Sequence, residues 1–260
     1  MLEATDIRVA FGRREILHGV DLRAAPGTVT CIVGPNGSGK TTFLRALTGD
    51  VTFTGSVTIN ARDTSRLRAW ELAALRAVLP QAATLSFPFT VEEVVRIGLR
   101  AGTEGDHAEI AAAALGRVGL AGYGDRDYQV LSGGEQQRVQ LARVLAQVWH
   151  PVSRNGARWM FLDEPVSSLD LGHQLDVMRI ARDFAEAGGG VVAVMHDLNL
   201  SAMFGHQMLC LSEGRIIAAG SPEAVMTDAT LSRAYGCRVR VNAVPGDQAA
   251  FILPHAVQPI

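Results

Sequence analysis

A glycine-rich segment near the N-terminus constrains the fold of this chain more than any other feature. Residues 34–41 read GPNGSGKT, which fits the phosphate-loop pattern G-x-x-x-x-G-K-[ST] at every defined position. An apolar, β-branched stretch at 28–33 precedes it and predicts a strand, and the spacing over 41–48 predicts a helix. Strand, glycine loop and helix in this order are typical of a nucleotide-binding α/β domain.

The residue types of this loop match the chemistry of phosphate binding. Glycines let successive backbone N–H groups point at the phosphates, and the helix N-terminus adds positive potential. Lys40 supplies a full charge, and the Thr41 hydroxyl can bind Mg²⁺. We therefore expect the nucleotide to be held by Gly34, Pro35, Asn36, Gly37, Ser38, Gly39, Lys40 and Thr41.

Two carboxylates follow a second apolar stretch, which predicts a strand at 159–162. Open α/β sheets present ligand-binding residues at the carboxyl ends of their strands. Asp163 suits a Mg²⁺ ligand, and Glu164 could orient and deprotonate an attacking water. A pair of acids after a strand is also common in a solvated turn, so this pair alone leaves both interpretations open.

The string LSGGEQ at 131–136, followed by a helical run to Val148, resolves that choice. It is the signature of the ATP-binding-cassette (ABC) family, and the chain resembles this family over nearly its whole length. The resemblance implies an α/β fold: a P-loop NTPase cassette with a RecA-like core, an antiparallel β subdomain and an inserted α-helical subdomain. The family landmarks occur in order, at Phe11, 34–42, Gln81, 131–136, 163–164, 168–170 and His196.

The resemblance also implies individual roles. Phe11 would stack on adenine, although a phenylalanine near a strand end could instead be core. Gln81 would sense Mg²⁺ and water, and His196 would contact the γ-phosphate and position Glu164. In the family two cassettes pair head to tail, so each ATP would also contact the partner's signature turn. Thr42, Ser132, Gly133, Gly134 and Asp170 complete the expected ATP-binding set.

The pattern along the chain predicts one ABC ATPase domain over 1–260. Residues 82–156 should form the helical subdomain, with helices at 91–99, 108–118 and 134–148 and a solvated loop at 150–157. Strands are predicted at 2–9, 15–24, 55–59, 77–80 and 191–195, and a hairpin at 209–218. Residues 237–260 are expected to form a short C-terminal strand region and a loose tail.

Charge balance and hydrophobic content limit the classes of partner that the chain can be expected to bind. With 24 basic and 26 acidic residues, the chain lacks the basic excess that favours nucleic acid, so none is expected. No apolar run approaches the roughly 18 to 20 residues that span a bilayer, so any contact with the membrane should come through a permease. Three widely spaced cysteines are expected to be reduced thiols, and the N-terminus does not resemble a signal peptide.

The complete catalytic set favours an active ATPase. A regulatory module would be expected to lose Glu164 or Lys40, and soluble repair or ribosomal cassettes carry coiled coils or a second cassette. The resemblance therefore implies a cassette homodimer, two separate transmembrane permease subunits and a periplasmic heme-binding protein, with the cassette peripheral on the cytoplasmic face of the inner membrane. The permease contact is expected around residues 86–90.

Cargo is inferred from resemblance alone. The segments MHDLNLSAMFGHQMLCLSEGRIIAAGSPEAVM and LDLGHQLDVM look like the cassettes of importers for heme, ferric siderophores and cobalamin. The match is closest to hemin importers. Hemin import is therefore the expected function, with siderophore or cobalamin import as the alternative and a soluble non-transport ATPase as the less favoured reading.

Overall fold

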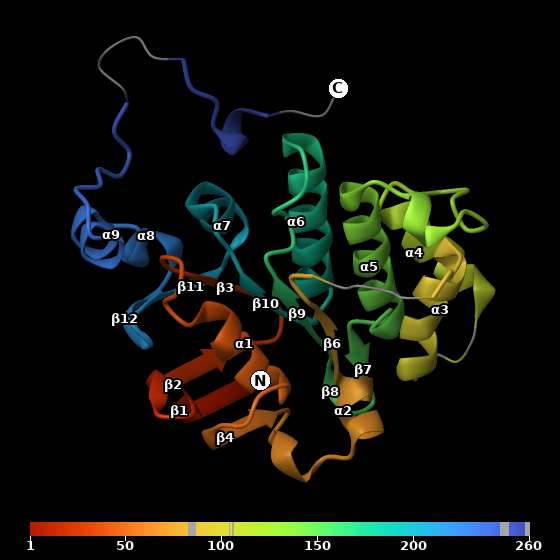
Figure 1. The fold of residues 1–260 in the computed structure, drawn as a ribbon, viewed down its shortest axis with the longest axis horizontal. Helices are drawn as coiled ribbons and strands as arrows, with labels where there is room; N and C mark the ends of the chain where they lie inside the picture. The colour runs from red at the N-terminus through yellow and green to blue at the C-terminus, as the bar shows by residue number, and fades with distance from the viewer. Residues whose placement is uncertain (83–86, 104, 106, 245–249, 258–260) are drawn as a thin grey trace.

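The computed structural model describes residues 1–82, 87–103, 105, 107–244 and 250–257. Figure 1 shows a central sheet with an antiparallel sheet on one side and helices on the other. The group α3, α4 and α5 stands beside α6, and the C-terminal segment lies beyond α7 and α9. Within the described residues, no helix is both long and apolar enough to cross a membrane.

The central sheet carries the residues that the sequence analysis singled out. Its strand order is β12-β11-β3-β10-β9-β6 among the described residues. All neighbours pair in parallel except β12, which forms an antiparallel hairpin with β11. The strands are β3 (Val29–Val33), β6 (Arg76–Leu79), β9 (Trp159–Asp163), β10 (Gly190–Val194), β11 (Gln207–Ser212) and β12 (Arg215–Gly220).

A second, antiparallel sheet has the strand order β2-β1-β4-β5. Its strands are β1 (Leu2–Phe11), β2 (Arg14–Ala24), β4 (Thr54–Ile59) and β5 (Arg62–Asp63). Helix α1 (Lys40–Thr48) packs between the two sheets, where Phe43 contacts the same apolar core as Trp159 and Phe161. The next residues of β9, Met160 and Leu162, face the other core, because successive strand side chains alternate.

Helices lie on the other side of the central sheet. α5 (Gly133–Gln147), α6 (Leu171–Glu186) and α7 (Leu198–Phe204) pack against its strands, and α3 (Val91–Ala101) and α4 (Ala108–Arg117) pack against α5. α3 and α5 pack closely, since a Cβ at Gly98 would lie 2.0 Å from the Arg143 carbonyl oxygen. Just after α5, the Trp149 ring lies 5.0 Å from the Arg117 guanidinium carbon. Helices α3, α4 and α5 all lie between residues 82 and 156.

Short elements were missed by the sequence analysis. They are the strand β5, the helices α2 (Ala69–Leu75), α7, α8 (Pro222–Val225) and α9 (Asp228–Tyr235) and the 3₁₀ turns η1 (Thr64–Arg66), η2 (Tyr128–Val130) and η3 (Pro254–Ala256). The expected loop at 150–157 contains a small hairpin, β7 (Val152–Ser153) and β8 (Gly156–Ala157). Asn60 holds this hairpin, because its amide donates to the Asn155 and Ala157 carbonyls at 3.0 and 2.9 Å.

The C-terminal segment differs from its prediction. Its described residues, 237–244 and 250–257, contain η3 and no strand. No ladder partner pairs with these residues, and an extended segment without a partner does not make a stable strand. The expected strand region is therefore absent from the described part of the chain.

Candidate functional site

The phosphate loop joins buried β3 to α1 through three glycines with positive φ. Gly34, Gly37 and Gly39 have φ of 143°, 75° and 100°, a region that L side chains rarely adopt. A Cβ at Gly34 would lie 2.0 Å from the Leu211 carbonyl oxygen, so the loop also packs tightly against β11. At position 34 only glycine can combine a positive φ with this close contact to β11.

Lys40 is held inside the curve of the loop. It is 5% exposed, and its Nζ donates to the carbonyls of Gly34 and Pro35 at 2.8 and 3.0 Å. Burial lowers the pKa of Lys40, while the carboxylates of Glu164 and Asp163 act in the opposite direction. The loop thus presents a cation on the side where phosphate oxygens would bind.

Asp163 and Thr41 meet beside the loop. Asp163 ends β9 and is 3% exposed, and its Oδ1 accepts a hydrogen bond from Thr41 Oγ1 at 3.1 Å. Burial raises the pKa of Asp163, and the Thr41 hydrogen bond partly offsets this. These hard oxygens fit Mg²⁺, which typically uses one or two protein oxygens with phosphates and water. The described residues contain no cluster of three His, Cys, Asp or Glu side chains that could hold a metal without a nucleotide.

Glu164 has a strained backbone next to this pair. Its φ is 52°, in the left-handed region that is uncommon for residues other than glycine. Its N–H donates to the Val194 carbonyl at 3.1 Å, and its carbonyl accepts from Ser167 N and Gln137 Nε2 at 3.3 Å each. These bonds keep the residue in an unfavourable conformation that turns it away from the strand direction.

The Glu164 carboxylate lies between two side chains from neighbouring strands. Oε2 accepts from Gln81 Nε2 at 2.9 Å, and Oε1 is 2.5 Å from His196 Nε2. Gln81 follows β6 and His196 follows β10, and these two strands flank β9 in the sheet. Parallel neighbours bring their carboxyl ends to the same edge, which explains why residues 81, 164 and 196 converge.

The structure does not bring the signature turn to the phosphate loop of the same chain. Ser132 caps α5 through a reciprocal pair with Glu135, whose N–H donates to Ser132 Oγ at 3.3 Å. The Ser132 hydroxyl in turn donates to Glu135 Oε2 at 2.7 Å. Gly133 lines a cavity with Gln81 and Ser168 that does not include the loop. Gly134 lies beside Ser168 and Leu169.

Two further predicted ATP-binding residues do not line the cavity that contains the loop. Phe11 ends β1 and is 56% exposed, so it does not belong to the core. Asp170 caps α6, where its carboxylate accepts from His173 N at 3.0 Å and faces His173 Nδ1 at 2.8 Å. The backbone hydrogen bond from His173 lowers the pKa of Asp170.

A cavity of about 320 Å³ contains most of the predicted phosphate-binding and catalytic residues. It is lined by Arg14, Ile16, Asn36, Gly37, Gly39, Lys40, Thr41, Thr42, Glu164 and His196. The sequence analysis missed Arg14 and Ile16, which reach the cavity from β2, a strand of the antiparallel sheet. It also missed Gln137, which holds the Glu164 carbonyl. Their only sequence signal was nearness to Phe11 and to the signature.

Comparison with known proteins places this geometry in a family. A family model described as ABC transporter matches residues 17–167. The chain is 62% identical over 255 residues to the hemin import ATP-binding protein HmuV of Roseobacter denitrificans, covering 98% of each chain. It is 55% identical over 259 residues to the protein of the same name from Rhizobium meliloti, covering 98% of this chain and 99% of that one.

Solved structures have the same fold. A dimeric ATP-binding cassette in a post-hydrolysis state with ADP and phosphate superposes with a TM-score of 0.74 and 27% identity, covering 85% of this chain and 99% of that one. A cassette of an ABC transporter in its ADP conformation superposes with a TM-score of 0.76 and 24% identity, covering 91% of this chain and 97% of that one. The chain belongs to the ABC transporter family and is one of its ATP-binding, ATP-hydrolysing subunits.

Proposed function

We propose that this chain is the ATPase motor of a hemin importer, working as a homodimer attached to two transmembrane permease subunits on the cytoplasmic face of the inner membrane. The observation that carries the hydrolytic part is the convergence of Gln81 and His196 on the Glu164 carboxylate beside the phosphate loop. A carboxylate in this position can serve as general base for water, with the histidine and glutamine orienting it.

Each residue at the loop has a distinct task in this mechanism. The backbone N–H groups of 34–42 and the Lys40 ammonium bind the phosphates, and Thr41 and Asp163 would hold Mg²⁺. Mg²⁺ would neutralise charge on the phosphate oxygens. Glu164 would accept the proton of the attacking water, and His196 would bind the γ-phosphate. His196 Nε2 now lies 2.5 Å from Glu164 Oε1, so this nitrogen must leave the carboxylate before it can bind the γ-phosphate.

The signature turn supports the homodimer. Ser132 and Gly133 lie at the N-terminus of α5, and the cavity that Gly133 lines is separate from the cavity that contains the phosphate loop. A helix N-terminus attracts anions, so this turn is suited to a nucleotide bound by a second copy. In that arrangement Phe11 would stack on adenine and Asp170 would lie near the opposing copy.

The permease contact is proposed beside the same helical group. Ser86 lies outside the described residues, but Phe87 is 69% exposed, and Val130, in η2, is 74% exposed. The Phe87 carbonyl accepts from Gln129 Nε2 at 3.4 Å, which joins the two segments. Phe89 packs against the core, so only part of the expected FPF loop is available to a partner.

Hemin as cargo is supported by the hemin import ATP-binding proteins that share 48 to 62% identity with this chain. Ferric siderophore and cobalamin import are the alternatives. A periplasmic heme-binding protein would deliver the cargo to the permease, outside the reach of this chain.

The test is uptake into proteoliposomes that contain the chain, its permease and its binding protein. Heme, a ferric siderophore and cobalamin are offered separately with ATP, using wild type and Glu164→Gln. ATP-dependent heme uptake that the variant loses would support the proposal. Uptake of another chelate would overturn hemin as cargo, and ATPase activity without any uptake would overturn the transport role.

A further inference from the structure

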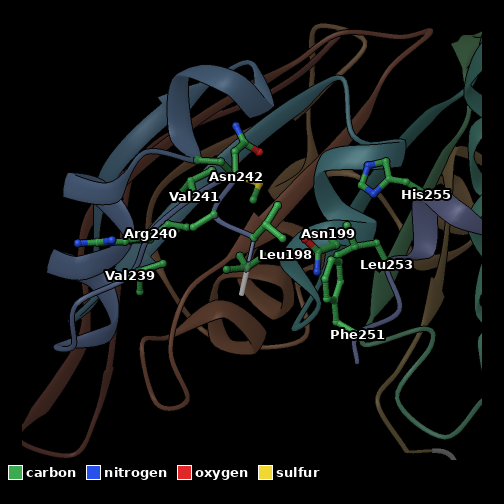
Figure 2. A pocket seen from close by; sticks show the side chains of 13 residues that line it. Leu198, Asn199, Val239, Arg240, Val241, Asn242, Phe251, Leu253 and His255 are labelled. Atoms are coloured by element: carbon green, nitrogen blue, oxygen red, sulfur yellow. The ribbon is translucent and has the colours of Figure 1, made fainter. Parts of the chain in front are cut away.

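A second cavity lies at the C-terminal end of the chain, away from the phosphate loop. Its volume is about 720 Å³, within the range of roughly 300 to 1,000 Å³ typical of small-molecule sites. Figure 2 shows His255, Phe251 and Leu253 on one side, Val241 and Asn242 on the other, and Leu198 between them. Described residues of the C-terminal segment thus form part of the walls of this cavity, together with residues of α7 and α9 and Met226.

The walls leave apolar surface exposed to water. Val244, Phe251 and Leu253 are 76%, 53% and 42% exposed, although all three line the cavity. Apolar side chains gathered around one hollow are typical of a binding site, because a ligand that covers them removes their surface from water. The ligand should therefore be largely apolar.

The polar groups of the cavity define the ligand further. His255 contributes an imidazole and Met226 a thioether, which are the side chains that commonly bind porphyrin iron through its axial positions. Arg240 lies at the edge, where its exposed guanidinium could pair with carboxylates that point to solvent. Apolar walls, an imidazole and a cation at the rim together match an iron porphyrin with carboxylate side chains.

The cavity is connected to the hydrolytic residues through the start of α7. Leu198 and Asn199 line it, and both follow Asp197, the residue that caps α7. Asp197 comes directly after His196 in the sequence, and its Oδ1 accepts a hydrogen bond from the N–H of Asn199 at 2.7 Å. A ligand that contacts the first turn of α7 would therefore stabilise the present position of His196, in which the histidine is 2.5 Å from Glu164.

We propose that this cavity binds iron porphyrin and that binding slows ATP hydrolysis by keeping His196 Nε2 at Glu164 Oε1, where it cannot bind the γ-phosphate. The choice of porphyrin rests on the proposed function in hemin import. A ligand shifts such an equilibrium only by its difference in affinity between the two arrangements. Because the cavity lies on the ATP-binding subunit, it would respond to heme on the side of the membrane where heme is released.

The binding test is a titration of the purified full-length chain with hemin and with iron-free protoporphyrin, followed by absorbance. His255→Ala should weaken hemin binding about tenfold or more, by loss of an iron ligand, and leave protoporphyrin binding unchanged. Val241→Trp, which fills the cavity, should weaken both. The matched control is His107→Ala, because His107 is an exposed histidine of the helical group outside the cavity. Equal hemin affinity in all variants would overturn the site.

The regulatory test measures ATP hydrolysis against hemin concentration. Wild type and His107→Ala should slow as hemin is added, whereas His255→Ala and Val241→Trp should keep their basal rate. Slowing that is identical in all variants would overturn the coupling. If proteoliposomes take up no heme, the proposed cargo is overturned, but the titration of the purified chain stands as an independent result. If they take up heme and the purified chain binds no hemin, only this inference is overturned.

Discussion

Two glycine-rich turns begin helices in this chain, and their chemistry differs. The phosphate loop ends at Gly39, which has positive φ and caps α1 without any side-chain hydrogen bond. The signature turn begins at Ser132, whose side chain forms a reciprocal cap with Glu135. Gly133 and Gly134 do not have positive φ, and nothing lies within 4 Å of a Cβ placed on Gly133.

The difference shows that glycine serves two purposes in one protein. In the phosphate loop it permits a backbone path that other residues cannot follow, and the N–H groups of the first turn of α1 stay available for phosphate. In the signature turn the backbone path is ordinary, and glycine keeps the surface open beside a helix that is already capped. The phosphate loop therefore needs glycine for the backbone path of this chain's own fold. The signature turn needs glycine so that a binding partner can come close to its surface.

The largest expected effect comes from a substitution at Glu164, which lies outside both turns. Glu164→Gln removes the proposed base, so hydrolysis should fall by about 10² to 10⁴ while ATP binding persists. Phosphate release and equilibrium binding of a labelled ATP analogue measure the two properties. Glu213→Gln is the control, because Glu213 is an exposed glutamate with φ of 49° that lies outside the site. Turnover at the wild-type rate in Glu164→Gln would contradict the assignment of the base.

The next effect tests whether the two turns act on opposite copies. Gly133→Gln places a larger neutral side chain in open space, so the monomer should keep its thermal midpoint within a few degrees while hydrolysis falls about tenfold or more. Lys40→Ala should lose hydrolysis through weaker phosphate binding.

A mixture of these two variants provides the decisive comparison. If the copies pair head to tail, each mixed dimer has one site with both an intact loop and an intact signature turn, so mixing should restore hydrolysis. Phosphate release before and after mixing measures this. A mixture no more active than its components would show that loop and turn do not share a nucleotide across copies.

The third effect compares glycines within the phosphate loop. Gly34→Ala should lower the free energy of unfolding by about 2 kcal/mol or more, because its Cβ would meet the Leu211 carbonyl oxygen at 2.0 Å. Gly37→Ala should cost only about 1 kcal/mol, because it has positive φ but open space around it. Denaturant unfolding measures both, and equal losses would mean that packing against β11 adds nothing to the conformational requirement.

The smallest effect concerns the charge beside the loop. Burial raises the pKa of Asp163, so the folded chain holds the proton more tightly than the unfolded chain, and the ionised form destabilises the fold above that pKa. Asp163→Asn should therefore raise the thermal midpoint by a few degrees at neutral pH, about 1 kcal/mol, while lowering hydrolysis.

This gain has a defined pH dependence. It should shrink as the pH falls through the raised pKa toward that of an ordinary aspartate, because wild type then becomes neutral as well. Thermal scans across this pH range, with exposed Asp125→Asn as control, measure it. A gain that grows on acidification would contradict the assigned direction.

The predictable part of the site came from residues at strand ends. Asp163, Glu164 and His196 follow apolar runs, and adjacent parallel strands necessarily bring such positions together. Arg14 and Gln137 could not be found this way, because neither follows a strand of the parallel sheet: Arg14 begins β2 of the antiparallel sheet, and Gln137 lies within α5. The C-terminal strand region was expected from the family resemblance alone, and among the described residues of that segment no strand pairs with either sheet.

The three tryptophans provide separate optical reporters for parts of this molecule. Trp159 is fully buried between the sheets, Trp149 lies against Arg117 beside the helical group, and Trp70 is 63% exposed at α2. Emission from Trp159 should change when the two sheets separate, whereas Trp149 should respond to displacement of α4 against α5. Variants that keep one tryptophan each would allow motion of the helical group to be timed against nucleotide turnover in solution.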